Sequence, residues 1–431
     1  MTMPADLADA AARDRARGAL VATLQGPDFL RRFRDIRVEP AATPRGWPAG
    51  PSRAALSDRD LAWHWVNGHP SGKDLPESDR PPIVIDEPLV WGGAVMSHFG
   101  HTIAEQFQRV LFSRLVAPEA SCLFSLPKGW DEARVPGYFW GACDWFGLPR
   151  DRVRLVTDRP VLARDLTVLR QGEQFQPAGQ PAGTRNHAWC GPLPEYLAAL
   201  NLHQAGQGLA TGTTGMVYVS RSRLSPGEIP IPGEALLVER MQAAGVEVIW
   251  PETLPIRDQL AAFARARTLI FAEGSAMHVR QFLGYLPQHV VVISRRRRME
   301  LVEEGLRPRC ERLTYIDAVA ANVIFTVSPM GVAERWRAFP LMDQDLLLEG
   351  LAAAGLDLRA GWDRDGFERA QETLLHAWAE EVCRRGRPAD LETRLRLLEG
   401  SLLGAGLGDH LPRLKRIAMA ADAARQTGPA A

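Results

Sequence analysis

Residues 216–283 constrain the fold most, because strand-like and helix-like stretches alternate along them with short breaks. The strands read MVYV, VEVIW and TLIFA, and the helices between them read GEALLVERMQAAG and RDQLAAFARAR. Regular alternation of this kind predicts a parallel β-sheet covered by helices. Open parallel sheets bind ligands at the carboxyl ends of their strands. The polar stretches that follow MVYV and TLIFA are therefore the first candidates for a binding site.

A second array of the same kind comes earlier in the chain. Four strand-like stretches alternate with helix-like stretches at residues 98–115 and in PGYFWGACDWFGL; the strands are PPIVIDEPLVWGG, SCLFSLP, RVRLVTD and PVLARDLTVLR. A Gly-, Pro- and Gln-rich stretch at residues 171–190 then marks a linker or a surface loop. We therefore predict an α/β protein with two similarly built halves.

The two arrays divide the chain, whose 431 residues exceed what one hydrophobic core usually holds. Residues 1–80 indicate a charged N-terminal helix and a loop-rich lead-in, 81–200 a first α/β domain, and 201–335 a second one. Residues 336–431 carry helix-like stretches and predict a C-terminal helical extension. This extension could pack across both domains, form a homo-oligomer interface or hold a partner.

Composition excludes several classes of protein. Lys+Arg and Asp+Glu both number 51, and this zero net charge argues against general nucleic-acid binding, which depends on a basic field. The five cysteines are scattered without a CxxC pair, which argues against a disulfide framework or a structural zinc site. The N-terminus lacks the apolar core of a signal peptide, and no run approaches about 20 apolar residues. We expect a cytoplasmic protein and leave contact with a membrane surface open.

A first polar cluster lies in the stretch SHFGHTIAEQFQR. In an α-helix with about 100° per residue, His98, His101, Glu105 and Arg109 fall within about 80° of one another. An apolar strand and a turn that contains Gly93 come before this helix, so its start should lie at the carboxyl edge of the sheet. The cluster suits a general base, because a carboxylate can orient an imidazole or the reverse.

The same residue types allow two other interpretations. A solvated helix face with ordinary i,i+4 pairs would show the same pattern. His98, His101 and Glu105 could also form a facial triad around a metal ion, although their spacing is not a specific metal signature. We favour a catalytic cluster because four polar side chains follow a Gly-rich turn.

Two further polar stretches follow strands of the second array. Arg221 and Arg223 come directly after MVYV, and arginines at a strand end can hold a diphosphate through paired hydrogen bonds. The stretch EGSAMH follows TLIFA and supplies Glu273, Gly274, Ser275, Ala276 and His278.

EGSAMH predicts a turn into a helix. Gly274 would let the backbone approach a ligand closely, and the amides at the helix start would attract phosphate. Farther along the chain, four consecutive arginines at residues 295–298 indicate a solvated loop, and we assign them no catalytic role.

The order and spacing of these motifs resemble glycosyltransferase family 61, in the form found among bacterial capsule and lipopolysaccharide biosynthesis proteins. The resemblance covers residues 91–114 and 216–283. YVSRSR is similar to the family's Ser-Arg strand end, and two glycines before a helix with His101 and Glu105 are similar to its upstream signature. The other positions that resemble the family pattern are Arg221, Glu234, Pro251, Glu252 and Gln259.

The chain departs from the family pattern at two places. Many members have Pro-His-Gly-Ala-Gly where this chain has Ala-Glu-Gly-Ser-Ala, so Glu273 stands in place of a histidine and His278 follows one helical turn later. The family's Asn-Tyr-X-His-Trp is altered to Ser-His-Phe-Gly-His at residues 97–101. These changes leave the donor and the division of catalytic roles open.

The resemblance implies a GT-B architecture, in which two Rossmann-like domains face each other across a cleft. It also implies inverting transfer of a sugar from a nucleotide sugar to a glycan or another hydroxyl acceptor. Arg221 and Arg223 would neutralise the leaving diphosphate together with the amides of residues 274–276, and Ser275 or His278 would add a hydrogen bond. Glu105 or His101 would deprotonate the acceptor, with Gly93, His98 and Arg109 in support.

The resemblance further implies surface polysaccharide biosynthesis. It leaves open whether the acceptor is lipid-linked, whether the protein contacts the inner membrane and whether it forms a homo-oligomer. We expect no cofactor besides the nucleotide sugar as co-substrate and no metal, because no Asp-X-Asp motif stands in a suitable position. Two other classes stay open: a metalloenzyme centred on His98, His101 and Glu105, and a catalytically inactive protein that binds nucleotide sugars or serves as a scaffold.

Overall fold

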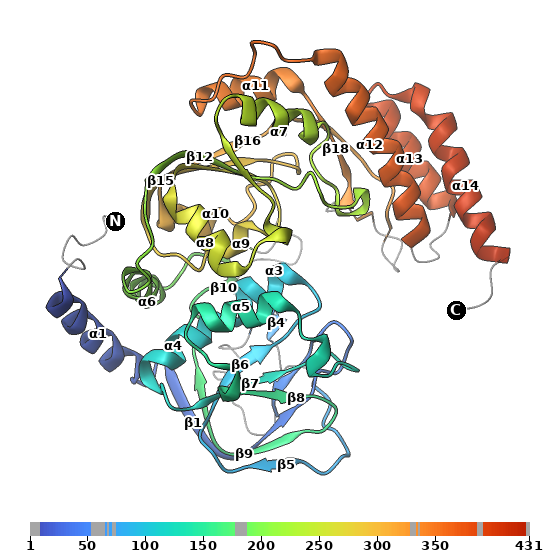
Figure 1. Cartoon of the computed structure of the whole chain (residues 1–431). Helices are drawn as coiled ribbons and strands as arrows, with labels where there is room; N and C mark the ends of the chain where they lie inside the picture. Colours follow the sequence, from blue (N-terminus) through green and yellow to red (C-terminus); the bar gives the residue numbers. More distant parts are fainter. Residues whose placement is uncertain are drawn as a thin grey trace.

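Two β-sheets with helices between and around them make up most of the protein (Figure 1). The computed structural model describes residues 9–52, 65–66, 69–70, 75–176, 188–327, 333–334, 337–385 and 391–427. Helices from the C-terminal part of the chain lie to one side of the second sheet. Both large sheets contain parallel strands, so the predicted α/β class is confirmed.

The first sheet has seven strands, in the order β2-β1-β9-β6-β7-β8, with β5 beside β9. Its parallel strands are β5 (Ile83–Ile85), β6 (Leu89–Ala94), β7 (Ser121–Ser125), β8 (Val153–Val156) and β9 (Val161–Leu169). All residues of β6 and β7 are buried. Strands covered on both faces have continuous apolar sequences, which is why VWGG and SCLFS were recognisable.

The first sheet already begins within residues 1–80, where a lead-in was expected. After helix α1 (Ala10–Leu24), strand β1 (Leu30–Glu39) pairs antiparallel with β9, and β2 (Gly50–Pro51) pairs with β1. The sequence of β1, LRRFRDIRVE, is heavily charged, and most of its residues are at least partly exposed. Charged side chains are tolerated near the edge of a sheet, so this strand carried no apolar signal.

The helix predicted at residues 98–115 consists of three pieces: α3 (Phe99–His101), a π-helical turn η3 (Thr102–Gln106) and α4 (Gln108–Val116). Gln106 Oε1 accepts a hydrogen bond from the Ala94 amide at 3.1 Å. This approach needs Gly93, which has φ +131° and where a Cβ would lie 2.3 Å from Gln106 Oε1. Gly93 therefore supports the site by letting β6 dock on the π-helical turn.

The second sheet is parallel throughout, with the order β13-β12-β14-β15-β16. These strands are β12 (Thr214–Val219), β13 (Glu247–Ile249), β14 (Ala266–Ala272), β15 (Leu286–Ile293) and β16 (Cys310–Ile316). Counted along the chain, the spatial order is 2-1-3-4-5, that of a doubly wound sheet. Its direction of winding reverses between β12 and β14, and ligands bind such sheets at the carboxyl ends of those strands.

Helices connect these strands at the predicted places and also at residues 303–306, where no helix was predicted. They are α7 (Glu234–Ala243), α8 (Ile256–Arg265), the single-turn α9 (Met277–Arg280) and α10 (Glu303–Leu306). Helices α5 (Gly137–Trp145) and α6 (Pro194–Ala205) come before them. Within the stretch expected to be a linker, β10 (Gln174–Gln176) and β11 (Ala188–Cys190) form a short hairpin, and residues 177–187 between them lie outside the described residues.

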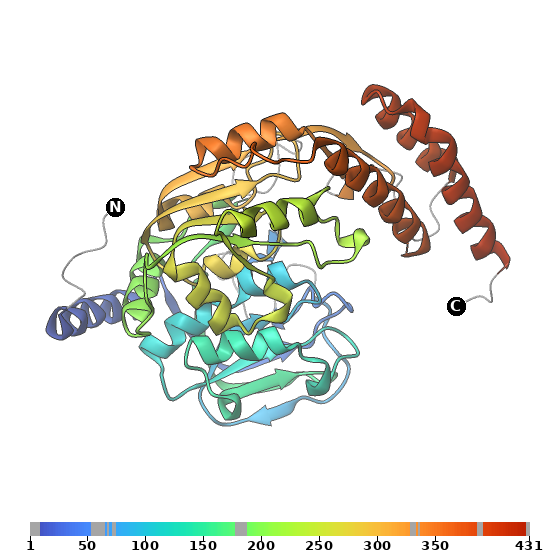
Figure 2. The ribbon, with the colours of Figure 1, turned by 45° about the horizontal axis from the view of Figure 1, so that its top comes forward.

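The C-terminal part is helical, as predicted, and contains α11 (Gln344–Ala353), α12 (Arg364–Arg385), α13 (Leu391–Gly404) and α14 (Leu411–Thr427). Helix α11 packs on the second sheet, because Leu347 and Leu351 belong to the same apolar cluster as Val291. Helices α12, α13 and α14 enclose a separate core with the antiparallel pair β17 (Val319–Val323) and β18 (Phe339–Met342). Figure 2 shows these last helices standing apart from the two sheets.

One hydrophobic cluster joins the two halves. It contains Val90 and Phe107 from the first half together with Leu269 and Phe282 from the second. The rings of Phe107 and Phe282 are 6.0 Å apart, and those of Phe146 and Phe282 are 4.7 Å apart. The sheets therefore share part of their core. Among the helices of the described residues, none combines the length and apolar character needed to cross a bilayer.

Candidate active site

Two predicted stretches meet where the strand order of the second sheet reverses. Arg221 follows β12 and Gly274 follows β14, and these two strands are adjacent and parallel. The Arg221 side chain lies directly against Gly274, where a Cβ would be 2.2 Å from Arg221 Nη1. Gly274 therefore makes room for the Arg221 guanidinium.

The Arg221 guanidinium is fixed on one side. Its Nη2 donates to the Glu228 carbonyl at 2.6 Å, and the Arg221 amide donates to Glu234 Oε1 at 2.6 Å. In the described part of the chain, its buried Nε has no hydrogen-bond partner. Burial lowers the pKa of Arg221 although Glu234 and Glu228 raise it, and the nearby Arg296 lowers it further. A bound anion would supply the missing acceptor.

Glu234, at the start of α7, closes the loop that carries Arg221. Its carboxylate is 2 % exposed and accepts hydrogen bonds from Tyr218 Oη at 2.8 Å, Ser220 Oγ at 2.9 Å and the Ile231 amide at 3.2 Å. Burial raises the pKa of Glu234, although these hydrogen bonds and that of the Arg221 amide lower it. This residue therefore positions the strand end and does not face a ligand directly.

Glu273 is fully buried and holds the loop after β15. Its Oε2 accepts hydrogen bonds from the amides of Arg295 and Arg296 at 2.8 and 3.2 Å, and its Oε1 pairs with the Arg296 guanidinium. The Arg295 guanidinium donates to the Glu273 carbonyl at 3.1 Å and to the Ile229 carbonyl at 3.4 Å. Glu273, which was expected to contact the donor, instead places two arginines.

Arg221, Arg295 and Arg296 thus form an arginine cluster at the carboxyl edge of the second sheet. The pKa of Arg295 is lowered to about 9, mainly by burial and also by the charges of Arg296 and Arg221. Guanidinium groups that repel one another in a poorly solvated place favour a bound anion.

The sequence interpretation of residues 295–298 as a solvated loop holds only for its second half. Arg297 and Arg298 are exposed, whereas Arg295 is 7 % exposed. The sequence contained a signal for the place of Arg295, because HVVVIS is the next strand after TLIFA. The end of that strand should reach the same edge of the sheet.

Arg223 does not join the arginine cluster. It is exposed, and its guanidinium lies over the Trp250 ring at 3.7 Å from the ring centre. A cation–π contact of this kind stabilises the turn after β12. Arg223 was expected to hold the diphosphate together with Arg221; in the structure the two side chains have different partners.

In the first half, His101 and Glu105 form a hydrogen-bonded pair between Nδ1 and Oε1. The side chain of Glu105 is 1 % exposed and that of His101 is 28 % exposed, so the imidazole covers the carboxylate. Burial alone lowers the pKa of His101, but the hydrogen bond and the charge of Glu105 raise it, and the net shift is upward. The carboxylate therefore orients the imidazole and increases its basicity.

Arg109 is buried near this pair, and the charge of Glu105 partly offsets the lowering of its pKa by burial. It is 1 % exposed, its Nε donates to the Leu169 carbonyl at 3.2 Å, and its Nη2 donates to Gln171 Oε1 at 3.1 Å. The π-helical turn η3 changes the angular spacing between residues 101 and 109. Arg109 therefore ties α4 to the end of β9 and supports the site from within the core.

The predicted sites of the two halves meet at Gly100. A Cβ at this glycine would lie 3.1 Å from His278 Cδ2, 3.2 Å from Ser275 Oγ and 3.3 Å from His98 Cε1. His98 is exposed, and its ring centre is 4.9 Å from that of His101. The His101–Glu105 pair and the EGSAMH turn therefore belong to one site.

Comparison with known protein families assigns the part of the chain that holds this site. Residues 99–293 match the family described as Glycosyltransferase 61. The chain carries a glycosyltransferase 61 domain. The predicted resemblance to glycosyltransferase family 61 is thus confirmed at the level of the family, while no curated protein matches the chain significantly. The matched range includes His101, Glu105, Arg221 and His278, whereas Arg295 and Arg296 follow just after its end.

Inside the glycosyltransferase 61 domain, the EGSAMH turn forms less helix than expected. The amides of Met277 and His278 donate to the carbonyls of Gly274 and Ser275 at 3.1 Å, so they are occupied within the turn. Ser275 and Ala276 are partly exposed. Because α9 is a single turn, its dipole is a weak source of phosphate affinity, and the arginine cluster carries more of the positive charge.

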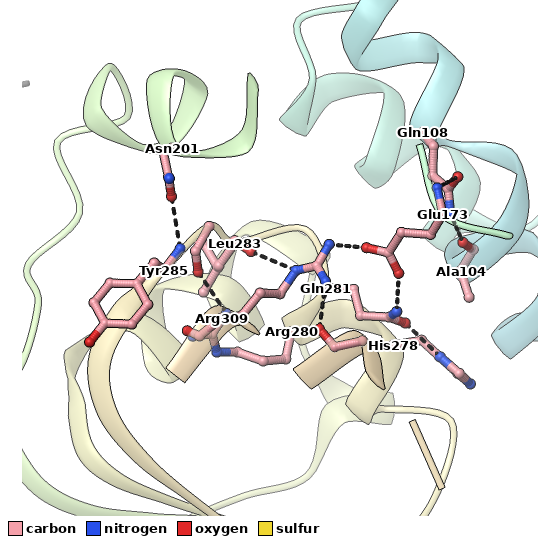
Figure 3. Close-up of polar contacts among 12 residues, drawn as sticks. Ala104, Gln108, Glu173, Asn201, His278, Arg280, Gln281, Leu283, Tyr285 and Arg309 are labelled. Atoms are coloured by element: carbon pink, nitrogen blue, oxygen red, sulfur yellow. Dashed lines mark hydrogen bonds and ion pairs between the residues drawn. The ribbon is translucent and has the colours of Figure 1, made fainter. Parts of the chain in front are cut away.

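His278 of the glycosyltransferase 61 domain is held by a buried polar network (Figure 3). Its Nδ1 shares a hydrogen bond with Gln281 Oε1 at 2.8 Å, and Gln281 Nε2 donates to Glu173 Oε2 at 2.6 Å. The Glu173 carboxylate also pairs with the Arg309 guanidinium. The backbone amide of Glu173 donates to Gln108 Oε1 at 2.6 Å. This network links α4 of the first half to α9 of the second.

The environment of His278 keeps its imidazole neutral near pH 7. The pKa of His278 is lowered to about 4, first by burial and then by the charges of His101 and His98, although the hydrogen bond to Gln281 Oε1 raises it. A neutral, oriented imidazole can make a hydrogen bond to a substrate but does not contribute a positive charge.

The metal interpretation of the first cluster receives no geometric support. In the parts of the chain that the structure describes, three ligand atoms of His, Cys, Asp or Glu come within 4.8 Å of one another at Glu372, His376 and His410. His98, His101 and Glu105 do not form such a group. The close group lies in the helical extension, outside the residues that match the family.

Proposed function

We propose that this protein transfers a sugar from a nucleotide sugar to a hydroxyl group of a glycan acceptor in surface polysaccharide biosynthesis. One observation carries the proposal. A cluster of one buried and two half-buried arginines at the winding reversal of the second sheet lies in the same site as a His–Glu pair of the first sheet. In this proposal each sheet forms one Rossmann-like half of a GT-B enzyme, with the donor on the second half and the acceptor on the first.

The arginine cluster would bind the diphosphate of the donor. Arg221 has a buried N–H group to offer, and Arg295 and Arg296 add charge that Glu273 only partly compensates. The departing diphosphate gains negative charge as the bond to the sugar breaks. Positive groups already in place stabilise this charge in the transition state.

His101 would act as the general base, with Glu105 as its orienting partner. The imidazole is the more exposed of the two, and its Nδ1 is occupied by Glu105, which leaves Nε2 for the acceptor. Nε2 would take the proton of the acceptor hydroxyl while the oxygen attacks the anomeric carbon. The bond from that carbon to the diphosphate breaks, and the diphosphate leaves with the electron pair. One such displacement inverts the anomeric configuration.

The proposal includes a reaction that needs no metal ion, since guanidinium groups supply the charge at the leaving group. The test incubates the purified chain with nucleotide sugars and acceptors, with and without a chelator, and measures nucleoside diphosphate release and product configuration. Lipid-linked glycans and free glycans are tested as acceptors in separate experiments. Activity that is lost with chelator and restored by one divalent ion would refute metal independence. Donor binding without turnover on any acceptor would instead favour a binding or scaffold protein.

A methyl group at residue 274 should weaken donor binding without unfolding the protein. In Gly274→Ala the new Cβ meets the flexible end of Arg221, which can move aside, so the fold should survive. Losing one charge-assisted hydrogen bond to phosphate costs about 1.5–3 kcal/mol, or about 10- to 150-fold in affinity. Calorimetric titration with nucleoside diphosphates measures this change. Gly215→Ala, in the strand that precedes Arg221 and with nothing within 4 Å of its Cβ, is the matched control and should bind normally.

The pH dependence of kcat/KM should report His101. Its pKa is raised by Glu105, so activity should rise with pH through a value above 6.5 as the imidazole loses its proton. In Glu105→Gln the raising partner is gone while burial still lowers the pKa, so the residual activity should rise at a lower pH. His289→Ala, in β15, serves as a control whose profile should match that of the wild type. An unshifted profile in Glu105→Gln would mean that another group is the base.

A further inference from the structure

Glu372, His376 and His410 bring three ligand atoms together in the helical extension. Glu372 and His376 are four residues apart on α12 and therefore share a face of the helix. His410 comes from the turn directly before α14, and α12 and α14 pack against each other. One ligand atom from each residue lies within 4.8 Å of the other two. The three side chains therefore span two helices that are distant in sequence.

The central residue of this group is a buried histidine whose hydrogen bonding is incomplete. His376 is 5 % exposed, and among the described residues its Nε2 has no hydrogen-bond partner. The ring of His410 is 5.6 Å from that of His376, and its Nδ1 is 3.7 Å from Glu372 Oε1. A buried polar atom without a partner is uncommon in folded proteins, and a metal ion would satisfy it.

Electrostatics in this place allow a cation. The charged groups that act on His376 are Arg413, Glu372 and Glu380, together with the neighbouring His410. Arg413 opposes a cation, whereas the carboxylates of Glu372 and Glu380 favour one.

We propose that Glu372, His376 and His410 bind one zinc ion that joins α12 to the start of α14. Two imidazoles and one carboxylate form a ligand set that zinc accepts, with water in the fourth position. Ligand atoms around tetrahedral zinc are about 3.3 Å apart, given bonds of about 2.0–2.1 Å, so the half-exposed His410 and the exposed Glu372 would move inward on binding. The expectation of no metal rested on cysteine spacing and on Asp-X-Asp, neither of which concerns this site.

The test uses the untagged full chain, freed of metal by chelator and then titrated with zinc alone. We expect one equivalent to bind and the midpoint of thermal unfolding to rise with zinc concentration, because a ligand of the folded state stabilises it. Cobalt in place of zinc should give the visible absorption of a tetrahedral site. These readouts do not depend on transferase activity, so they succeed or fail independently of the proposed function.

Variants locate the ion. His376→Ala and His410→Ala should each lower zinc affinity by at least about 100-fold, the upper end of what losing even an outer partner of a ligand costs. Glu372→Gln, at an exposed position that the fold tolerates, should lower it by at least about tenfold. The matched control His289→Ala should bind zinc as the wild type does.

Three results would overturn the proposal. The first is no zinc binding at micromolar concentration. The second is unchanged binding in both His410→Ala and Glu372→Gln, which would leave the group as an ordinary His–Glu pair. The third is loss of binding in His98→Ala with retention in His410→Ala, which would place the ion in the first cluster.

Discussion

His101→Ala is expected to lower kcat by about 100- to 10,000-fold, the usual contribution of a general base. The side chain is 28 % exposed and lies outside the main core, so its loss should not unfold the protein. Donor affinity should stay within about twofold, because the arginine cluster is untouched. Single-turnover rates with saturating donor, together with nucleoside diphosphate titrations, separate the two effects.

Glu105→Gln distinguishes the two members of the pair. The amide keeps the shape and a hydrogen bond to Nδ1 but removes the charge that raises the pKa of His101. If Glu105 orients the imidazole, the loss of kcat should be smaller than in His101→Ala, and combining both changes should add little further. A larger loss in Glu105→Gln than in His101→Ala would make the carboxylate the base. Near-normal turnover in both variants would place the base elsewhere.

Arg309→Met is expected to cost about 3–5 kcal/mol of unfolding free energy, because it leaves the carboxylate of Glu173 buried without its charge partner. Both side chains of this ion pair are almost inaccessible, at 0 % and 1 % exposed. Denaturant unfolding measures the loss. Arg307→Met is the matched control, since Arg307 forms an ion pair with Glu303 but is 58 % exposed; it should cost less than about 1 kcal/mol.

The Glu173–Arg309 pair also makes the loss of unfolding free energy in Arg309→Met dependent on pH. Burial raises the pKa of Glu173, whereas Arg309 and Gln281 lower it. Without Arg309 this pKa rises further, so the carboxyl group takes up a proton in the folded state as pH falls. Arg309→Met should therefore be more damaging at pH 8 than at pH 5. Adding Glu173→Gln should recover part of the stability, and a double variant as unstable as the sum of both single changes would contradict a direct pairing.

The second sheet could be predicted from the sequence because each of its features is local. Buried parallel strands are continuous apolar runs, and the helices between them have clear breaks. Arg221 and the EGSAMH turn followed from their places after β12 and β14. Their convergence needed only the rule that parallel strands end at one edge.

The remaining features depend on contacts between distant residues. Arg295 is buried because Glu273, on the neighbouring strand, binds its backbone amide, and a run of four arginines does not reveal this. A π-helical turn contains Glu105 and precedes the helix that carries the buried Arg109, and a helical wheel with constant spacing cannot represent such a turn. Strand β1 is charged and obtains its place by pairing with β9, where Leu30 lies opposite Leu169, which is 139 residues later in the chain. Local propensity could not reveal a pairing of this kind.

The hydrophobic cluster that joins the two sheets limits how substrates can enter. Swinging the halves apart would bring Phe107 and Phe282 into water, and each large side chain exposed in this way costs about 1.5–3 kcal/mol. The buried Glu173–Arg309 pair would separate as well. We therefore expect donor uptake and product release to proceed by rearrangement of the loops after β12 and β15, while the two sheets keep a fixed mutual orientation throughout the catalytic cycle.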